Sequence, residues 1–313
     1  MTLQEPAVTS HQPGGDARPT IRVLVTGASS GIGRATVDTL VKQGAFVWAS
    51  VRRQEDAAAL EAAHPGRVTA LRFDVTDEQA VASAGVDVCA VGPLHGLVNN
   101  AGVALPAPLE FIPLAEFRRQ LEINLVGQLA VTQAVLPALR VAAEAKAQSG
   151  NQGVSGGASL PSPRIVMIGS IGDRIAGPMI GAYHASKFGL AGLTGSLRAE
   201  LAHAGIDVVL VEPGAIATPI WSRGVTAADR LLRSLPAEAG RRYGTQIRAA
   251  RDQAARADRD GLQPEAVADV IATALTVRRP RPRYLVGRDA RIAAALTYLP
   301  DRLRERILAQ LAR

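Results

Sequence analysis

Thr26-Gly27-Ala28-Ser29-Ser30-Gly31-Ile32-Gly33 is the segment from which the architecture of this chain follows. A β-branched run at 21–25 precedes it and predicts a buried strand, and a helical pattern follows it from 34 to 43. Glycines in such a turn let the backbone bend tightly and let a pyrophosphate reach the free N–H groups at the helix N-terminus. The spacing Gly-x-x-x-Gly-x-Gly is not the commonest dinucleotide pattern, so a purely structural turn stays open. Its position between strand and helix favours a dinucleotide site, with cofactor contacts from Gly27, Ser29, Ser30, Gly31, Ile32 and Gly33.

Strand-like and helical patterns alternate along the rest of the chain. The further strand-like runs are 46–51, 68–73, 94–98, 164–169, 206–211 and 283–287. Helical patterns separate them, including a long one from about Leu114 to Ala147. This alternation predicts a parallel sheet whose right-handed crossovers place helices on both faces. We therefore expect an α/β fold: a single Rossmann-type domain over 21–288, with a doubly wound parallel sheet of about seven strands.

Four segments differ in composition from this domain and predict its accessory parts. Residues 1–20 are polar and rich in Pro and Gly, which predicts a disordered tail and not a signal peptide. The Gly/Ser/Pro-rich stretch 149–163 predicts a flexible surface insertion. Residues 215–262 combine helical patches and many arginines without a strand, which predicts a mobile lid over a substrate. Residues 289–313 predict a basic amphipathic tail of two helices, separated at Pro300.

The composition limits the class of protein. With 313 residues, of which 47% are apolar and 20% charged, the chain can bury a large core, and no uninterrupted apolar run has membrane-spanning length. Its single cysteine excludes an internal disulfide and fits a cytoplasmic location. A net charge of +7 could serve nucleic acid, a membrane surface or an anionic cofactor, but dispersed arginines and 4% aromatic residues argue against nucleic acid. The scattered histidines have no neighbouring ligands and predict no metal site.

The residues that follow three of the predicted strands bear on the cofactor. An acidic residue after the second strand would bind the ribose hydroxyls of NAD, but Arg52 and Arg53 stand there, which suits the 2′-phosphate of NADP(H). NAD(H) stays open, because both arginines could be solvated at a helix start. Asp74, after the third strand, could accept a hydrogen bond from an adenine amino group or cap the next helix. Asn99, after the fourth strand, could hold either the cofactor or the loop backbone.

The segment Tyr183-His184-Ala185-Ser186-Lys187 carries the candidate chemistry. A tyrosine and a lysine at this spacing share one helix face, where they could be no more than a solvated i,i+4 pair. The ammonium charge would also favour the ionised phenol and lower the tyrosine pKa, which suits a general acid/base. Ser170, at the end of the fifth strand, could hold a carbonyl or alcohol oxygen at the same place. The three side chains therefore predict a site for proton transfer to or from a substrate oxygen.

Taken together, these motifs resemble the short-chain dehydrogenase/reductase family over about residues 21–287. The motifs that carry the resemblance are Thr26 to Gly33, Asn99 to Gly102, Asn124, Ser170, Tyr183 with Lys187, and Pro213-Gly214. The section from Leu94 onward and the ending 283–289 look like the steroid- and retinol-type branch. The family implies a Rossmann domain, a nicotinamide cofactor and an Asn-Ser-Tyr-Lys tetrad. The insertion at 149–163 departs from the family pattern, in which this connection is usually short.

The resemblance implies a role for each matching residue. Tyr183 would be the general acid/base, Ser170 would orient the substrate oxygen, and Lys187 would lower the tyrosine pKa and hold the nicotinamide ribose. Asn124, which lies at mid-helix among apolar neighbours and could also bridge a helix distortion, would hold a water in a proton relay. The expected cofactor contacts on the remaining elements are Val75, Ala101, Pro213, Gly214, Ile216 and Thr218.

The lid sequence predicts a lipophilic alcohol or ketone of steroid, retinoid or fatty-chain type, because an apolar wall favours burial of apolar surface. The residues proposed for that wall are Ile216, Ile220, Trp221, Val225, Leu231, Leu232 and Leu235, with Ile175, Met179 and Ile180 ahead of Tyr183. The same side chains could instead pack the lid onto its own domain. The lid arginines that could meet an anionic head group, or stay solvated, are Arg223, Arg230, Arg233, Arg241 and Arg242.

Two other functions are compatible with these motifs. One is a catalytically silent, cofactor-binding regulator, although such proteins usually lack the tyrosine or the lysine. The other, among enzymes, is a 3-oxoacyl-type reductase. The helical patterns 114–147 and 183–204 carry apolar residues on more than one face, which predicts a homodimer or homotetramer. The C-terminal tail could contact a membrane peripherally, although docking on the domain or on a partner subunit is the stronger expectation.

Overall fold

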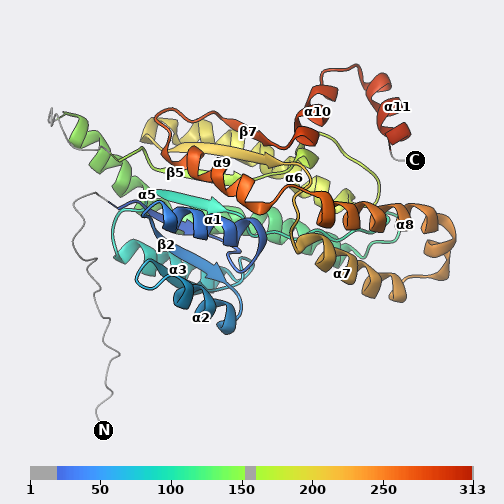
Figure 1. The fold of residues 1–313 in the computed structure, drawn as a ribbon, viewed down its shortest axis with the longest axis horizontal. Helices are drawn as coiled ribbons and strands as arrows, with labels where there is room; N and C mark the ends of the chain where they lie inside the picture. Colours follow the sequence, from blue (N-terminus) through green and yellow to red (C-terminus); the bar gives the residue numbers. More distant parts are fainter. Residues whose placement is uncertain (1–19, 152–159, 312–313) are drawn as a thin grey trace, which may run out of the picture.

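The computed structural model describes residues 20–151 and 160–311, and there the chain forms one parallel sheet between two layers of helices (Figure 1). The strands are β1 Arg22–Val25, β2 Phe46–Val51, β3 Val68–Arg72, β4 Gly96–Asn99, β5 Arg164–Ile168, β6 Asp207–Pro213 and β7 Arg283–Val286. Their order is β3-β2-β1-β4-β5-β6-β7, and every neighbouring pair is parallel. The order reverses between β1 and β4, which makes a crevice at their carboxyl ends. The predicted doubly wound Rossmann-type sheet is confirmed.

Helices connect the strands and cover both faces of the sheet. They are α1 Gly31–Lys42, α2 Gln54–Ala63, α3 Glu78–Ala90, α4 Leu114–Leu121, α5 Gly127–Asn151, α6 Gly181–Leu201, α7 Ile220–Ser234, α8 Ala237–Asp260, α9 Pro264–Thr276, α10 Arg288–Leu296 and α11 Asp301–Leu311. Residues 1–19 of the predicted tail and 152–159 of the predicted insertion lie outside the described residues.

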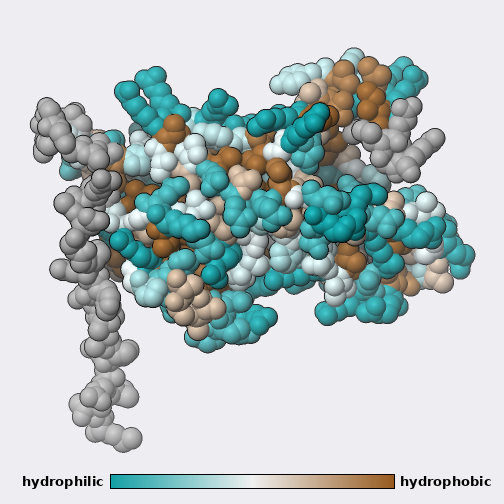
Figure 2. Space-filling view, viewed as in Figure 1, coloured by the Kyte–Doolittle hydropathy of each residue, from teal (hydrophilic) through white to brown (hydrophobic). Residues whose placement is uncertain are grey.

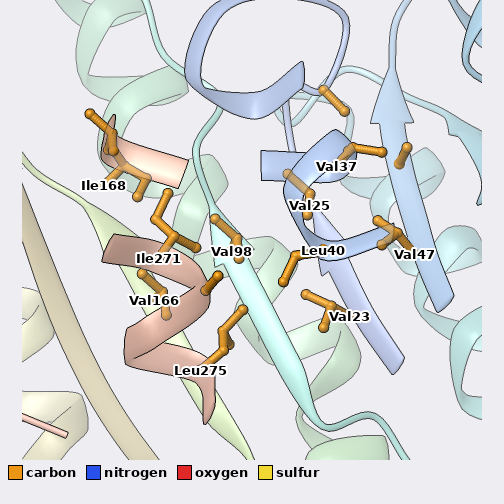
Figure 3. Close-up of a cluster of buried hydrophobic side chains, with 14 of the residues drawn as sticks. Val23, Val25, Val37, Leu40, Val47, Val98, Val166, Ile168, Ile271 and Leu275 are labelled. Carbon is orange, nitrogen blue, oxygen red and sulfur yellow. The ribbon is translucent and has the colours of Figure 1, made fainter. Parts of the chain in front are cut away.

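The strands are apolar on both faces because helices cover both sides of the sheet. Val23 and Val25 of β1 belong to the layer shared with α1, α2 and α9, whereas Leu24 belongs to the layer shared with α3, α5 and α6. Figure 3 shows the first layer, where Leu40 of α1 and Ile271 of α9 lie on either side of Val98 of β4. Packing on both faces holds the strand ends in fixed positions, and the candidate site is built on those ends.

The long helical pattern forms α4 and α5, joined through a π-helical turn, Glu122–Val126. By length and composition Leu114–Ser149 could cross a membrane, and among the described residues it is the one helix that meets that criterion. Val131, Val135 and Leu139 of α5 are nevertheless buried in the layer that packs against the sheet. A core helix with an apolar stripe passes the same test, and the packing of α5 is of that kind.

The predicted lid forms α7 and α8, which lie together past the carboxyl ends of the strands (Figure 1). Asp229 of α7 and Arg251 of α8 form an ion pair at 2.5 Å. Val225 and Leu232 of α7 line a small pocket with Met179, so these two side chains pack the lid against the body. The prediction that Val225, Leu232 and Met179 wall the substrate site is therefore wrong for all three, and the alternative of lid packing holds for them.

The C-terminal tail consists of α10 and α11, which Pro300 separates. Ala290 and Ala294 are buried where α10 meets the body. Figure 2 shows hydrophobic residues gathered over α10 and α11. Among the side chains of this arm that the structure describes, the large hydrophobic ones that are exposed are Ile292 at 56%, Tyr298 at 86% and Leu303 at 46%.

Candidate active site

The glycine-rich turn between β1 and α1 is held by the segment that follows β4. Asn100 and Ala101 donate their backbone N–H groups to Thr26 Oγ1 at 2.9 and 3.0 Å, and Asn100 Nδ2 donates to the Thr26 carbonyl oxygen at 2.8 Å. A Cβ at Gly33 would lie 2.3 Å from the Gly27 carbonyl oxygen, so only glycine fits there. Gly27 itself has φ of +64°. The turn is a tight, buttressed cradle whose backbone can approach a ligand closely.

The N-terminus of α1 opens into this cradle. Ser30 is the N-cap residue, but its side chain makes no capping hydrogen bond to the helix. The first N–H groups of the helix therefore lack the side-chain acceptor that commonly satisfies them, and the helix dipole adds positive potential at the same place. This donor set fits a phosphate group, which agrees with the predicted dinucleotide site.

One cavity of about 960 Å³ joins this turn to the candidate chemistry. Its walls include predicted cofactor and catalytic residues from the ends of strands β1 to β6 and from the helices that follow them. Those residues are Gly27, Ser29, Ser30, Gly31, Ile32, Arg52, Asp74, Val75, Ala101, Ser170, Tyr183, Lys187, Pro213, Gly214, Ile216 and Thr218. The fold thus gathers these residues, which are scattered over the sequence, around a single volume of a size usual for ligand sites.

Four predicted site residues do not line the cavity: Gly33, Arg53, Asn99 and Asn124. Gly33 supports the turn from behind, as described above. Arg53 is turned toward the start of α2, where it pairs with Glu55. Asn99 is 1% exposed and donates to Thr132 Oγ1 at 2.9 Å, so it braces the interior next to β4.

Asn124 lies in the π-helical turn and is also 1% exposed. Its Oδ1 accepts from the Val103 N–H at 2.9 Å, and its Nδ2 donates to the Val103 carbonyl oxygen and to Ser186 Oγ, both at 2.9 Å. The amide therefore joins the loop after β4 to helix α6. The wider helical turn explains how a mid-helix amide reaches that loop, and the expected bridging of a distortion agrees with this geometry. Its predicted water-relay role stays a prediction.

Arg52 and Asp74, which follow β2 and β3, line the end of the cavity next to those strands. Arg52 Nη1 lies 3.6 Å from Asp74 Oδ2, and both side chains are partly exposed. Asp74 Oδ1 also accepts from the Thr76 N–H at 3.1 Å. The N-cap of α3 is Asp77, whose side chain accepts from Ala80 N–H. The alternative that Asp74 caps this helix is therefore wrong.

Ser170, Tyr183 and Lys187 line the cavity together. Ser170 Oγ accepts from the Gly172 N–H at 3.0 Å, which fixes the hydroxyl at the end of β5. Lys187 Nζ donates to the Ile168 carbonyl oxygen at 2.7 Å and lies 5.7 Å from the centre of the Tyr183 ring. A phenol, a hydroxyl and an ammonium thus stand side by side, which is the arrangement needed to hold a substrate oxygen and move its proton.

The electrostatics of this group differ from the prediction. Burial raises the pKa of Tyr183, and the Ser170 hydrogen bond that lowers it does not offset that effect. Burial lowers the pKa of Lys187 to about 8, against the attraction of Asp173. The expectation of a lowered tyrosine pKa is therefore wrong for this structure, because withdrawal of the phenol from water is the largest effect on that pKa and raises it. A protonated phenol at neutral pH is suited to donate a proton to a carbonyl oxygen.

Behind Ser170, the buried carboxylates of Asp173 and Glu212 meet two arginines that remain partly exposed, Arg174 and Arg283. Arg174 donates to both Glu212 carboxylate oxygens, at 2.5 and 3.0 Å. Arg283 donates to Glu212 Oε2 at 3.1 Å and to Asp173 Oδ1 at 3.2 Å. Burial, followed by the hydrogen bond and charge of Glu212, raises the pKa of Asp173 to about 8. The cluster ties the end of β5 to β6 and β7, and so supports the position of Ser170.

The structure adds site residues that the sequence interpretation did not assign to the cofactor side. Asn100 holds the glycine-rich turn, and Arg119 and Gln120 of α4 line the cavity. Arg223 of the lid donates to Ser30 Oγ at 3.2 Å. The resemblance pointed to the segment that contains Asn100, and the arginine-rich lid pattern drew attention to Arg223, but neither pattern identified these contacts.

The predicted apolar wall is only partly present. Of those residues Ile216, Ile220, Trp221 and Leu231 line the cavity, joined by Val103 and Leu105 after β4. Leu235, Ile175 and Ile180 do not line it, and neither do the lid arginines Arg233, Arg241 and Arg242. Arg242 pairs instead with Glu110 and Glu238, both at 2.5 Å. Arg223 and Arg230 do line the cavity. In the described parts of the chain, no three metal-ligating side chains come together.

Comparisons with known proteins agree with this architecture. The family described as short chain dehydrogenase matches residues 22–228. An NADPH-dependent 3-dehydrocapnine reductase of Ornithobacterium rhinotracheale is 34% identical over 91% of this chain and 94% of that protein. Human retinol dehydrogenase 5 is 32% identical over 91% of this chain and 87% of that protein. A short-chain dehydrogenase from Burkholderia cenocepacia, solved in complex with NADP, is 26% identical, covers 92% of this chain and 98% of its own, and has a TM-score of 0.66. This chain belongs to the short-chain dehydrogenase/reductase family.

Proposed function

We propose that this protein is an NADP(H)-dependent oxidoreductase that acts on a lipophilic alcohol or ketone, with Tyr183 as the general acid/base. The observation that carries the proposal is that Ser170, Tyr183 and Lys187 line the same cavity as the glycine-rich turn. When bound in that cavity, the nicotinamide supplies the hydride that reduces a carbonyl carbon, or accepts it in the reverse direction. The chain itself supplies the binding cradle, the orientation of the substrate oxygen and the proton.

The residues divide this work according to their positions. Ser170, fixed by Gly172, orients the substrate oxygen beside Tyr183. Tyr183 holds its proton, because burial raises its pKa, and gives it to the carbonyl oxygen during reduction. Lys187, anchored on Ile168, provides a positive charge next to the phenol that stabilises the phenolate once the proton has left. In oxidation the same groups act in reverse.

NADP(H) is favoured over NAD(H) by the charge at the end of β2. Arg52 lines the cavity there, and its guanidinium can form paired hydrogen bonds with a 2′-phosphate. The names of two similar proteins support the same choice, since one relative is NADPH-dependent and one solved neighbour holds NADP. Arg53 is not part of this proposal, because it faces α2.

A lipophilic substrate is supported by the wall between Tyr183 and the lid. Ile220, Trp221 and Leu231 of α7 line the cavity, and so do Val103 and Leu105 of the segment after β4. Burying an apolar chain against such side chains is worth about 25 cal/mol per Å² of surface. The name of the relative retinol dehydrogenase 5 points in the same direction.

The test is the specificity constant kcat/KM for aliphatic ketones of rising chain length, measured with NADPH. The proposal predicts a rise with each added methylene until the wall is filled. A Trp221→Ala variant should flatten that rise, whereas Val225→Ala should leave it in place, because Val225 lines the small pocket between the lid and the body and not the cavity. A flat or falling trend in the unmodified protein would overturn the lipophilic class.

An anionic head group on the substrate, as in a 3-oxoacyl-type reductase, is favoured by one further observation. Arg119 of α4 and Arg230 of α7 line the cavity from two sides. A carboxylate or acyl-carrier phosphate between them would gain two charged partners. If kcat/KM for a keto acid exceeds that for the matching neutral ketone, and Arg230→Ala abolishes the difference, this second candidate replaces the neutral lipophile. A silent regulator is less favoured, because the tyrosine and the lysine are both present in the cavity.

The state of assembly and the location in the cell are proposed on separate observations. Val126, Val141 of α5 and Phe188 of α6 are large apolar residues exposed at 43%, 47% and 45%. A homodimer or homotetramer that pairs these helices would cover them.

The arm of α10 and α11 presents exposed apolar residues beside arginines, so it could contact a membrane from a cytoplasmic location. Light scattering tests the proposed oligomer, and co-sedimentation with anionic vesicles tests the proposed membrane contact.

A further inference from the structure

A polar contact joins the lid to the glycine-rich turn. Arg223 of α7 donates from Nη1 to Ser30 Oγ at 3.2 Å, although the two residues are 193 positions apart in the chain. Gly31 packs against the start of the lid as well, since a Cβ there would lie 3.0 Å from Thr218 Cγ2. The lid arginine and the N-cap residue of α1 thus meet at the rim of the proposed dinucleotide cradle.

Ser30 is an incomplete partner for this guanidinium. An arginine carries five N–H donors and a full charge, whereas a serine hydroxyl offers it a neutral acceptor. Other lid arginines have carboxylate partners, as in the pairs Arg242–Glu110 and Arg251–Asp229. Within residues 20–151 and 160–311, no carboxylate lies within ion-pair distance of Arg223. The side chain is exposed and lines the cavity.

The N-terminus of α1 and the guanidinium of Arg223 therefore both direct positive potential at the same place in the cradle. The N–H groups at the start of α1 have no side-chain cap, and the guanidinium of Arg223 reaches the residue that would have capped them. A phosphate oxyanion placed there would accept from both, because helix N-termini and the planar arginine fork each match phosphate geometry.

We propose that Arg223 binds a phosphate of the dinucleotide and so couples the position of the lid to the bound cofactor. The inference rests on the proposed use of a nicotinamide dinucleotide. The phosphate is either one of the diphosphate, which NADPH and NADH share, or the 2′-phosphate, which only NADPH has. Since Trp221 and Ile220 belong to the same helix and line the substrate side, cofactor binding through Arg223 also places the substrate wall.

The first experiment measures the dissociation constants of NADPH and NADH by calorimetry for the unmodified protein, Arg223→Ala and Arg223→Lys. Arg233→Ala is the matched control, because Arg233 lies on the same helix, is exposed and does not line the cavity. Arg223→Ala should weaken NADPH binding by about tenfold to a hundredfold, Arg223→Lys should weaken it less, and Arg233→Ala should leave it unchanged.

Comparison of NADPH with NADH shows which phosphate Arg223 contacts. Equal weakening for NADPH and NADH supports a diphosphate contact, and weakening for NADPH alone supports a 2′-phosphate contact. Unchanged affinity for both cofactors in Arg223→Ala overturns the inference while the proposed function stands. An unmodified protein that binds neither cofactor overturns both together.

The second experiment measures the lid directly, without turnover. Amide hydrogen exchange across α7 should slow when the unmodified protein is saturated with NADPH, and it should slow less in Arg223→Ala at a concentration that also saturates the variant. Arg233→Ala should behave like the unmodified protein. Equal protection of α7 in Arg223→Ala and the unmodified protein would contradict the coupling of lid and cofactor.

Discussion

Lys187 Nζ lies 5.7 Å from the centre of the Tyr183 ring while it donates a hydrogen bond to the Ile168 carbonyl oxygen. The lysine is therefore held by the end of β5 and not by the phenol. From this fixed position, one helical turn away, we expect its charge to favour the phenolate once Tyr183 has lost its proton. This relationship makes the ionisation of Lys187 a determinant of how well the tyrosine can lose its proton.

The pH dependence of ketone reduction should follow Lys187. Burial lowers the pKa of this lysine to about 8, so its charge is present below that pH and is lost above it. We expect kcat/KM with NADPH to fall as the pH rises through about 8, because the phenolate then loses its neighbouring charge. Lys187→Arg should retain the charge and remove that decline. A flat profile for the unmodified protein between about pH 6.5 and pH 9.5 would contradict this assignment.

Asp173 should make the stability of the fold depend on pH. Its pKa is raised from 3.8 to about 8, with burial as the largest cause, so the folded state keeps a proton that the unfolded state releases. This contribution to stability is complete below about pH 3.8 and is lost as the pH rises through about 8. Asp173→Asn imitates the protonated acid and cannot ionise, so the unfolding free energy of this variant should fall less over this pH range than that of the unmodified protein. The difference between the two falls should be on the order of a few kcal/mol at most. Urea unfolding at a series of pH values measures the unfolding free energy of the unmodified protein and of Asp173→Asn. The same dependence of that free energy on pH in the two proteins would refute the prediction.

Gly33→Ala should disrupt the cofactor cradle. Its Cβ would lie 2.3 Å from the Gly27 carbonyl oxygen and 2.5 Å from Asn100 Nδ2, so the turn must shift. We expect loss of stability and loss of NADPH binding. Gly192→Ala is the control, because a Cβ there meets nothing within 4 Å in the middle of α6. It should stabilise the fold by about 0.5–1 kcal/mol through helix propensity. Thermal unfolding measures the stability of the two variants, and calorimetry measures their affinity for NADPH. Equal stability and equal affinity in the two variants would argue against a close-packed turn.

Arg52 and Arg53 should differ sharply although they are neighbours. Arg52 lines the cavity, and Arg53 pairs with Glu55 at the start of α2. Arg52→Ala should therefore weaken NADPH binding by about tenfold to a hundredfold and leave NADH binding nearly unchanged. Arg53→Ala should affect neither cofactor by more than about twofold. Tighter binding of NADH than of NADPH by the unmodified protein would remove the basis of this prediction.

Much of the fold and part of the site could be predicted because their signals are local. The alternation of strand and helix patterns specifies a parallel sheet, and such a sheet brings Thr26, Ser170 and Pro213 to one edge wherever they lie in the chain. The face shared by Tyr183 and Lys187 follows from helical spacing alone. These relationships need no knowledge of tertiary packing.

The remainder depends on packing that no local pattern encodes. Which groups Asn124 meets is decided by a π-helical turn and by the loop after β4. The side of α7 that faces the cavity is decided by how the lid docks, which separates Leu231 from Leu232. The pKa of Tyr183 rises because of burial, a property of the whole fold.

The most direct test of the central claim is the turnover of Tyr183→Phe with NADPH and a ketone that the unmodified protein reduces. Removing the phenol hydroxyl takes away the proton donor and leaves the cradle intact, so kcat should fall by at least about a hundredfold with little change in the dissociation constant of NADPH. Tyr243→Phe is the matched control, because that hydroxyl bonds to Glu110 on the lid side and does not line the cavity. Near-normal turnover in Tyr183→Phe would contradict the account.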